Sequence, residues 1–312
     1  MKRAARIATF ALCAAIPIRV SLAQTAYYDL DATRPVRIED ANVVDLYAIE
    51  LEPAPVRAEW LAGGRSRYRV SPHFAFGILP RTQVEASLPL ERRDLGAGPE
   101  SGAAGLELSA MHSFNNEREH RPAFALWIGA RVPVGALAAR GTRVGARGIM
   151  TRSFGFGRVH LNAEYSTTNK SSPCQPVAGA TSCTAVNDGH LCSIGEHGGA
   201  LRPTLSACMA AQSSAPAPAP LTPPRGRWGA GVAADHALPL RSLLLVAGVF
   251  AQRDARQGAP NDWTAETGLR WQLGPSSVFD VGVGRHFTGA DRSFSLTTGL
   301  AFELAAPGFL GR

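Results

Sequence analysis

The chain has 312 residues, with 32 basic and 25 acidic residues. Four of the basic residues fall within the first 23 positions, so the remainder has an excess of only three (28 − 25). This balance gives no basis for nucleic-acid binding, which needs a concentrated basic surface. No apolar run after residue 23 approaches the roughly 20 residues of a membrane-spanning helix.

Residues 1–23 are organised like a secretory signal peptide. A basic start precedes an apolar stretch, and the small-x-small sequence Ser21-Leu22-Ala23 predicts cleavage before Gln24. We therefore expect an exported protein with a periplasmic N-terminal segment, residues 24–42. Within that segment, residues 34–41 either fold into the periplasmic mouth of the domain that follows or form a simple extension.

Apolar and polar residues alternate almost everywhere after residue 43. In 263–273 the odd positions hold Trp, Ala, Thr, Leu, Trp and Leu, and the even positions hold Thr, Glu, Gly, Arg and Gln. A period of two places each set on its own face of a β-strand, and no segment shows a convincing helical period. The fold class is therefore all-β. The pattern predicts about twelve strands (range 10–14), near 44–54, 57–78, 81–92, 103–115, 122–134, 143–154, 157–167, 227–237, 241–252, 262–273, 276–286 and 292–304.

The connections between these strands alternate between tight and roomy. Tight ones are expected near 79–80, 155–157, 238–240 and 274–275, and roomy ones near 93–102, 135–142, 165–225, 254–261 and 288–292. Only 115–121 is longer than this rule allows. Outer-membrane barrels have short periplasmic turns and longer outer loops. We therefore predict a single antiparallel up-and-down transmembrane β-barrel over 43–304, followed by a C-terminal tail, 305–312.

A soluble exported β-protein would also alternate, but its polar face would meet solvent and is usually rich in Lys and Glu. After the signal peptide the sequence holds a single lysine, Lys170, and the polar faces carry Gly, Ser, Thr and scattered Arg and Glu. Aromatic residues near strand ends, such as Trp228 and Trp263, suit a bilayer interface. These features favour the membrane barrel.

If the apolar faces contact lipid, the polar faces line the lumen. The candidate lumen-lining residues are Arg67, Arg69, His73, Glu85, Glu107, Arg131, His160, Glu164, Glu266, Arg270, Asp280 and Glu303. With both signs present, these charges either pair and plug the lumen or set its selectivity. The sequence contains no G-x-S-x-G elbow and no convincing triad spacing, so we predict no enzyme and no cofactor.

The segment 168–225 is predicted to be a long extracellular loop rich in Cys and Pro. It holds the four cysteines outside the signal peptide: Cys174, Cys183, Cys192 and Cys208. Exported cysteines usually pair, so up to two disulfides are expected, with three pairings open; a Cys/His metal site is the alternative. The loop is either a stapled surface loop or a cap over the barrel mouth.

Several motifs resemble one family. They are the segment Trp271-Gln-Leu-Gly-Pro-Ser-Ser-Val-Phe-Asp-Val-Gly-Val-Gly-Arg285, the sequences Thr288-Gly-Ala-Asp-Arg292 and Thr298-Gly-Leu300, and, near the start, Arg34-Pro-Val-Arg-Ile-Glu-Asp-Ala41 and Phe76-Gly-Ile-Leu-Pro-Arg-Thr-Gln-Val-Glu-Ala-Ser-Leu-Pro89. Both ends of the mature chain are similar to the outer-membrane "transporter" family linked to the MetA pathway of phenol degradation.

This resemblance implies passage of aromatic or other small apolar compounds across the outer membrane of a Gram-negative bacterium. The implied partners are outer-membrane lipid, the outer-membrane assembly machinery and a small-molecule solute. Such barrels commonly end on an aromatic residue that the assembly machinery recognises, whereas here a tail follows Leu304, which leaves Phe302 or Phe309 for that role. The alternatives are an envelope-structural or surface-binding barrel acting through 168–225, and, third, a membrane-embedded hydrolase or a soluble exported β-protein.

Overall fold

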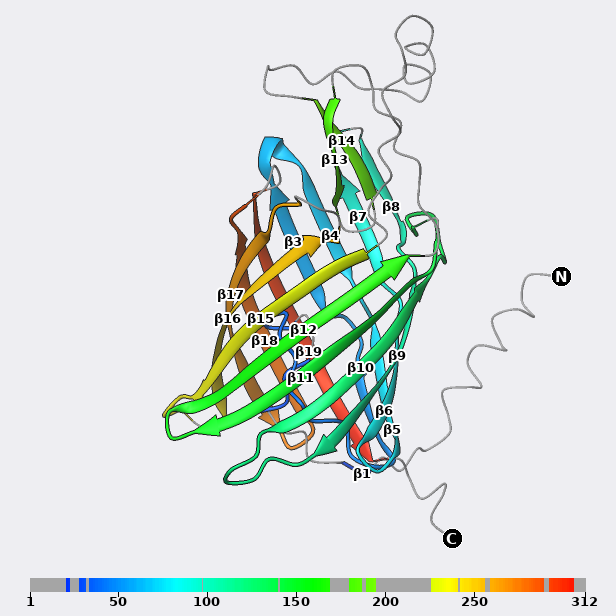
Figure 1. The fold of residues 1–312 in the computed structure, drawn as a ribbon. Coiled ribbons are helices and arrows are strands. Elements are labelled where there is room, and N and C mark those ends of the chain that lie inside the picture. Colours follow the sequence, from blue (N-terminus) through cyan, green and yellow to red (C-terminus); the bar gives the residue numbers. More distant parts are fainter. Residues whose placement is uncertain are drawn as a thin grey trace, which may run out of the picture.

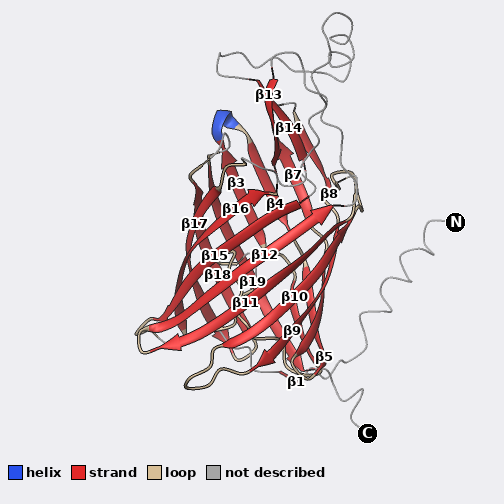
Figure 2. Ribbon diagram, viewed as in Figure 1, coloured by secondary structure: helices blue, strands red, loops and turns tan. Residues whose placement is uncertain are grey.

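The computed structural model describes residues 21–22, 28–31, 34–96, 98–139, 141–168, 180–186, 189–194, 226–240, 242–255, 259–288 and 292–305. Most of them form a closed antiparallel β-barrel (Figures 1 and 2). Its strands are β1 (Ser21–Leu22), β2 (Ala48–Glu52), β3 (Val56–Leu61), β4 (Ser66–Val70), β5 (His73–Leu79), β6 (Thr82–Ser87), β7 (Leu90–Asp94), β8 (Pro99–Ala103), β9 (Leu106–Asn115), β10 (Ala123–Val132), β11 (Arg143–Phe154), β12 (Gly157–Thr168), β15 (Gly226–Ala237), β16 (Leu243–Asp254), β17 (Asp262–Gly274), β18 (Ser277–His286) and β19 (Ser293–Ala305).

The barrel wall has twelve strands, because four of them are interrupted. At one end of the barrel β2 pairs with β5, β5 with β6, and β6 with β9. At the other end β3 pairs with β4, β4 with β7, and β7 with β8. These eight pieces make four wall strands, and β10–β12 and β15–β19 add eight more. Pairing of β19 with β2 and β3 closes the cylinder. Twelve strands and an all-β fold confirm the prediction.

The alternation predicted from the sequence is present in the wall. In β17 the side chains of Trp263, Leu269 and Trp271 are exposed on the outer face, whereas Glu266 and Arg270 are buried on the inner face. The same division holds along β4 and β5, where Tyr68 and Phe74 face outward. The outer surface is therefore apolar and the interior is polar, as a lipid-embedded barrel requires.

The predicted boundaries of the first two strands were wrong. The first wall strand runs through Ala48–Glu52 and Val56–Leu61, and the second through Ser66–Val70 and His73–Leu79. The chain turns between them at a short 3-10 turn, Ala62–Gly64, drawn blue in Figure 2. Gly63 and Gly64 have φ values of 74° and 73°, a conformation that glycine adopts without strain.

The connections largely follow the predicted asymmetry. The turns after β5, β11, β15 and β17 are short and lie at the lower end in Figure 1, together with the medium loop 116–122. The loop expected over 93–102 shrinks to 95–98, because β7 and β8 continue as a hairpin. Main-chain pairing satisfies the backbone there in place of water.

Residues 28–31 and 34–45 lie inside the barrel and form what we call the N-terminal segment, blue in Figure 1. Three of its apolar side chains, Leu30, Val36 and Ile38, are buried in one cluster with inward side chains of the wall. The wall residues of this cluster are Ala233, Leu244, Val246 and Phe250. Residues 34–41 therefore fold into the barrel and do not form a simple extension.

Several predicted features lie wholly or mostly outside the described residues: most of the signal peptide 1–23, Cys174, Cys208, most of loop 168–225, and the tail apart from Ala305. Within the loop, β13 (Ala180–Val186) and β14 (Gly189–Ile194) form a hairpin in which Cys183 is opposite Cys192. The disulfides remain a prediction. Within the described ranges no helix is long and apolar enough to cross a membrane.

Candidate functional site

None of the twelve predicted lumen-lining residues is exposed, and most of them contact an oppositely charged partner. His160, Arg270 and Asp280 are the most deeply buried, at 0%, 1% and 0% exposure. The alternation places them on the inner face because strand residues of one parity share a face. Their pairs are Arg67–Glu59, Arg67–Glu91, Arg69–Glu91, His73–Glu85, Arg131–Glu107, Glu164–Arg147, His160–Asp235, Glu266–Arg57, Arg270–Asp31 and Asp280–Arg34.

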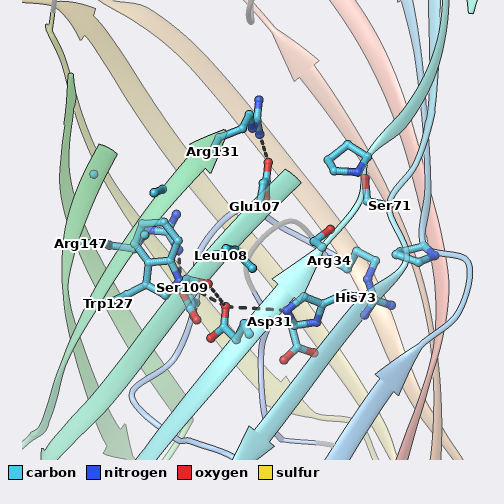
Figure 3. Close-up of a pocket in the computed structure, with 18 of the residues that line it drawn as sticks. Asp31, Arg34, Ser71, His73, Glu107, Leu108, Ser109, Trp127, Arg131 and Arg147 are labelled. Atoms are coloured by element: carbon cyan, nitrogen blue, oxygen red, sulfur yellow. Dashed lines mark hydrogen bonds and ion pairs between the residues drawn. The ribbon is translucent and has the colours of Figure 1, made fainter. Parts of the chain in front are cut away.

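A cavity of about 330 Å³ lies in the half of the barrel nearer the long loops. Its wall carries arginines and carboxylates from β9 to β12, including Arg131 and Glu107, which contact each other (Figure 3). A volume of this size exceeds the roughly 150 Å³ of an engineered cavity that binds benzene. The cavity can therefore hold a small organic molecule against charged groups of both signs.

Trp127 is the one tryptophan among the residues that line this cavity. The Arg147 guanidinium lies 5.0 Å from the centre of the indole ring, and its Nη2 is 3.1 Å from a Glu164 carboxylate oxygen. The indole Nε1 donates to Glu85 at 3.3 Å. Charged neighbours thus fix the indole ring in place, and an aromatic or planar solute could stack on this ring.

Glu85 is the hub of a second polar group in the same cavity (Figure 3). Its carboxylate accepts hydrogen bonds from Gln83 at 2.7 Å and from Ser109 at 2.8 Å. His73 lies 3.7 Å away, within ion-pair range when it is protonated. Sequence analysis placed His73 and Glu85 on the inner face, and the structure brings them together across β5 and β6.

The N-terminal segment is anchored by hydrogen bonds to inward side chains. The backbone N–H and C=O of Glu39 bond Asn162 at 3.0 and 2.8 Å, and the Ala41 N–H donates to Thr151 at 3.0 Å. The Glu39 carboxylate contacts Arg147. Burial outweighs this guanidinium and raises the pKa of Glu39 to about 8. Segment and cavity therefore share Arg147.

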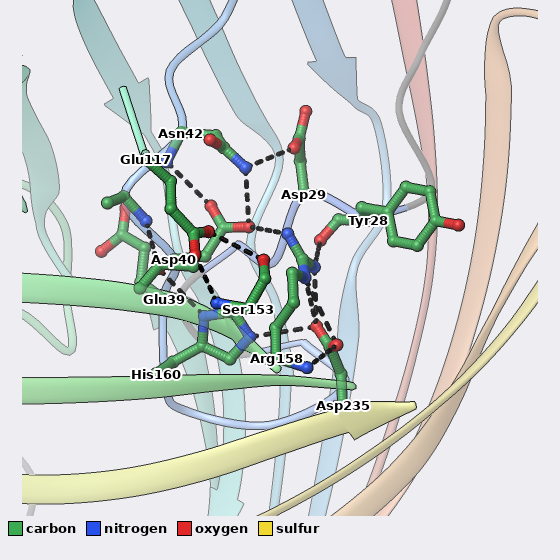
Figure 4. Close-up of polar contacts among 12 residues, drawn as sticks. Tyr28, Asp29, Glu39, Asp40, Asn42, Glu117, Ser153, Arg158, His160 and Asp235 are labelled. Atoms are coloured by element: carbon green, nitrogen blue, oxygen red, sulfur yellow. Dashed lines mark hydrogen bonds and ion pairs between the residues drawn. The ribbon is translucent and has the colours of Figure 1, made fainter. Parts of the chain in front are cut away.

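A buried cluster also holds the segment at Asp40, between Glu39 and Ala41 (Figure 4). Arg158 lies 2.6 Å from Asp235 and 3.3 Å from Asp40, and His160 bonds both Asp235 and Thr151 at 3.0 Å. Although this resembles the order acid–histidine–hydroxyl of a triad, Asp235, His160 and Thr151 do not line the cavity described above. The Thr151 oxygen also accepts a segment N–H. The ion pair of Arg158 with Asp40 and the hydrogen bond from Ala41 to Thr151 link the N-terminal segment to the wall.

The sequence pattern did not single out several inward charged residues that form these pairs or lie beside them. They are Asp31, Arg34, Glu39, Asp40, Glu50, Glu52, Arg57, Glu59, Glu91, Arg147, Arg158 and Asp235. Alternation alone could have found Glu50 and Glu52, since they alternate with Ile49 and Leu51. The charged residues of the N-terminal segment could not be found in this way, because apolar and polar residues do not alternate regularly in that segment. Glu303, which was predicted, is buried with no ion pair within the described chain.

A closed antiparallel cylinder with an apolar outer face and a charged interior defines a transmembrane β-barrel of the outer-membrane type. No family model matches the sequence, and no curated protein matches it. Among solved structures, an outer membrane channel from Pseudomonas putida F1 is similar over 85% of this chain and 98% of its own, with a TM-score of 0.58 and 10% identity. The NanC porin matches 80% of this chain and 98% of its own, with a TM-score of 0.48 and 8% identity.

Proposed function

We propose that this protein is an outer-membrane channel of a Gram-negative bacterium that admits small compounds. The observation that carries the proposal is the polar cavity of about 330 Å³ inside a closed barrel whose outer face is apolar. A soluble β-protein would present mainly polar side chains on its outer face, whereas this barrel exposes apolar side chains there and keeps many paired charges inside. Outer-membrane lipid contacts the outer face in this proposal.

The chemistry of the cavity favours solutes that carry polar groups. Arg131, Arg143 and Arg147 face the cavity together with Glu107 and Glu164. A wholly apolar solute would displace water from these groups without replacing their hydrogen bonds, and that is costly. An aromatic compound with a carboxylate or hydroxyl group could place its ring against Trp127. This agrees in part with the aromatic solutes implied by the MetA-pathway resemblance.

The N-terminal segment restricts passage in this proposal. Arg34 holds it in place through Glu52 and through Asp280 at 2.6 Å, and the Thr297 hydroxyl donates to the Pro35 carbonyl at 3.2 Å. The wild-type channel should therefore conduct weakly. Assembly would depend on the last strand, β19, in which Phe302 remains the candidate recognition residue; Phe309 lies outside the described residues.

Liposome swelling with a graded series of neutral and charged solutes tests the proposal. We expect slow but measurable entry through the wild type and faster entry through Arg34→Met, since that change leaves the carboxylates of Glu52 and Asp280 unpaired. Removing one partner of a buried ion pair costs about 3–5 kcal/mol. Arg92→Met, at an exposed outer position, is the matched control. Impermeable liposomes with every variant would contradict the proposal.

A further inference from the structure

Three carboxylates converge inside the barrel where the N-terminal segment meets the first wall strand. Asp31 comes from the segment, and Glu50 and Glu52 are two residues apart on β2, so both point inward. Each offers one oxygen atom, and these oxygens all lie within 4.8 Å of one another. Glu50 and Glu52 are 7% and 4% exposed.

The three side chains differ in how they are satisfied. Arg270 donates to Asp31 at 2.9 Å, and Arg34 contacts Glu52. Glu50 forms no ion pair with the described residues, and its buried Oε1 has no hydrogen-bond partner among them. A buried carboxylate oxygen without a donor is rare and costly. Its position within the cluster points to a ligand that the protein side chains do not supply.

The charge balance leads to the same conclusion. In their ionised forms, Asp31, Glu50, Glu52 and Asp280 carry four negative charges, and Arg34 and Arg270 supply two positive ones, which leaves an excess of two. Glu303 adds to this excess, since it is opposite Glu50 across β19 and β2 and is equally buried. Like charges directly opposite one another destabilise a sheet. With Glu303 the excess is three (5 − 2), and one divalent cation would reduce it to one.

We propose that Asp31, Glu50 and Glu52 bind one hard divalent cation of the calcium class. Carboxylate oxygens are the ligands that Ca²⁺ and Mg²⁺ prefer, and Ca²⁺–oxygen distances of about 2.3–2.6 Å place ligand oxygens up to about 5 Å apart. Asp31 and Glu50 also line a second cavity, of about 120 Å³, with room for water molecules that would complete the coordination. The cation would join the segment to the wall.

Calorimetric titration of the refolded, chelator-treated protein in detergent with calcium chloride, and separately with magnesium chloride, tests this site. We expect about one Ca²⁺ per chain and an increase in the thermal unfolding temperature on binding. Glu50→Gln keeps the size of the side chain and removes its charge. Loss of this direct ligand should weaken binding by more than the roughly 10–100-fold that follows loss of an outer-shell partner.

Two further variants make the result decisive. Asp31→Asn should weaken Ca²⁺ binding in the same way, and because Asp31 is not in the wall, the barrel itself should still fold. Glu107→Gln, a second inward glutamate paired with Arg131, should bind Ca²⁺ as the wild type does. Absence of both Ca²⁺ and Mg²⁺ binding in the wild type, or unchanged binding in Glu50→Gln, would overturn the proposal. Binding is measurable whether or not the barrel conducts.

Discussion

Single inward glycines decide whether the N-terminal segment fits inside the barrel. A Cβ atom at Gly282 would lie 2.3 Å from the Pro35 carbonyl oxygen, far inside van der Waals contact. The obstacle is backbone, which cannot move aside as the end of a flexible side chain could. Gly282 also has a neighbour with the same role, since a Cβ at Gly268 would lie 2.5 Å from the Pro35 side chain. The wall is therefore shaped to the segment.

The substitution Gly282→Ala should release the segment while leaving the barrel intact. Overpacking typically costs about 1–3 kcal/mol, and 1.4 kcal/mol is a factor of about ten in an equilibrium. Trypsin cleavage between Arg37 and Ile38 in the folded protein reports release, and we expect it to become about tenfold faster or more.

The matched control is Gly148→Ala, since the nearest atom to a Cβ there is the Ala163 carbonyl oxygen at 4.0 Å. Cleavage at Arg37 should stay at the wild-type rate in this variant. Equal cleavage rates in Gly282→Ala and the wild type would show that docking of the segment does not depend on the close contact between Gly282 and Pro35.

At the scale of elements, the segment combines apolar burial with a titratable anchor. Glu39 is held by Asn162 through its backbone and by Arg147 through its carboxylate. Burial raises the pKa of Glu39 to about 8, whereas the released segment would have the ordinary value near 4.5. A raised carboxyl pKa means that the docked state favours the protonated form.

Docking of the segment should therefore weaken as the pH rises. The contribution of Glu39 is fully present below about pH 4.5, decreases as the pH rises from there through about 8, and is lost above it. Channel conductance measured between pH 6 and 9 should increase over this range. Glu39→Gln, which cannot ionise, should reduce the increase. A wild-type conductance that falls with rising pH would contradict this assignment.

The sequence predicted the wall strands well and the segment poorly, for physical reasons. Alternation is a local property, so it located β9–β12 and β15–β19 within a few residues. It could not divide 44–78, where Pro53, Pro55 and the Gly63-Gly64 pair allow several turns. Ion-pair partners depend on strand register, which is set across the sheet. The segment's place depends on wall contacts distant in sequence, such as Glu39 with Asn162.

At the scale of the whole molecule, aromatic side chains ring the outer face near the strand ends. Toward the long loops, Tyr165 and Trp228 lie 4.4 Å apart between ring centres, and Trp60 stacks on Phe294 at 5.8 Å. Phe154 and Phe156 stack at the turn end of the barrel. Such rings settle at the two water–lipid interfaces of a bilayer. The apolar band between them must then contact hydrocarbon.

The depth dependence of a charged substitution tests whether lipid covers this band. Val249 is exposed on the outer face near the middle of β16, and Leu240 is exposed in the turn before that strand. An arginine at the bilayer midplane costs about 2–4 kcal/mol, and one near the interface costs about 0–1 kcal/mol. Urea unfolding in liposomes should therefore show a large loss of stability for Val249→Arg and little for Leu240→Arg. If the two losses were equal, or if Val249→Arg were neutral, water rather than hydrocarbon would surround the barrel. The apolar outer face would then need a different explanation, because such a face is stable only out of water.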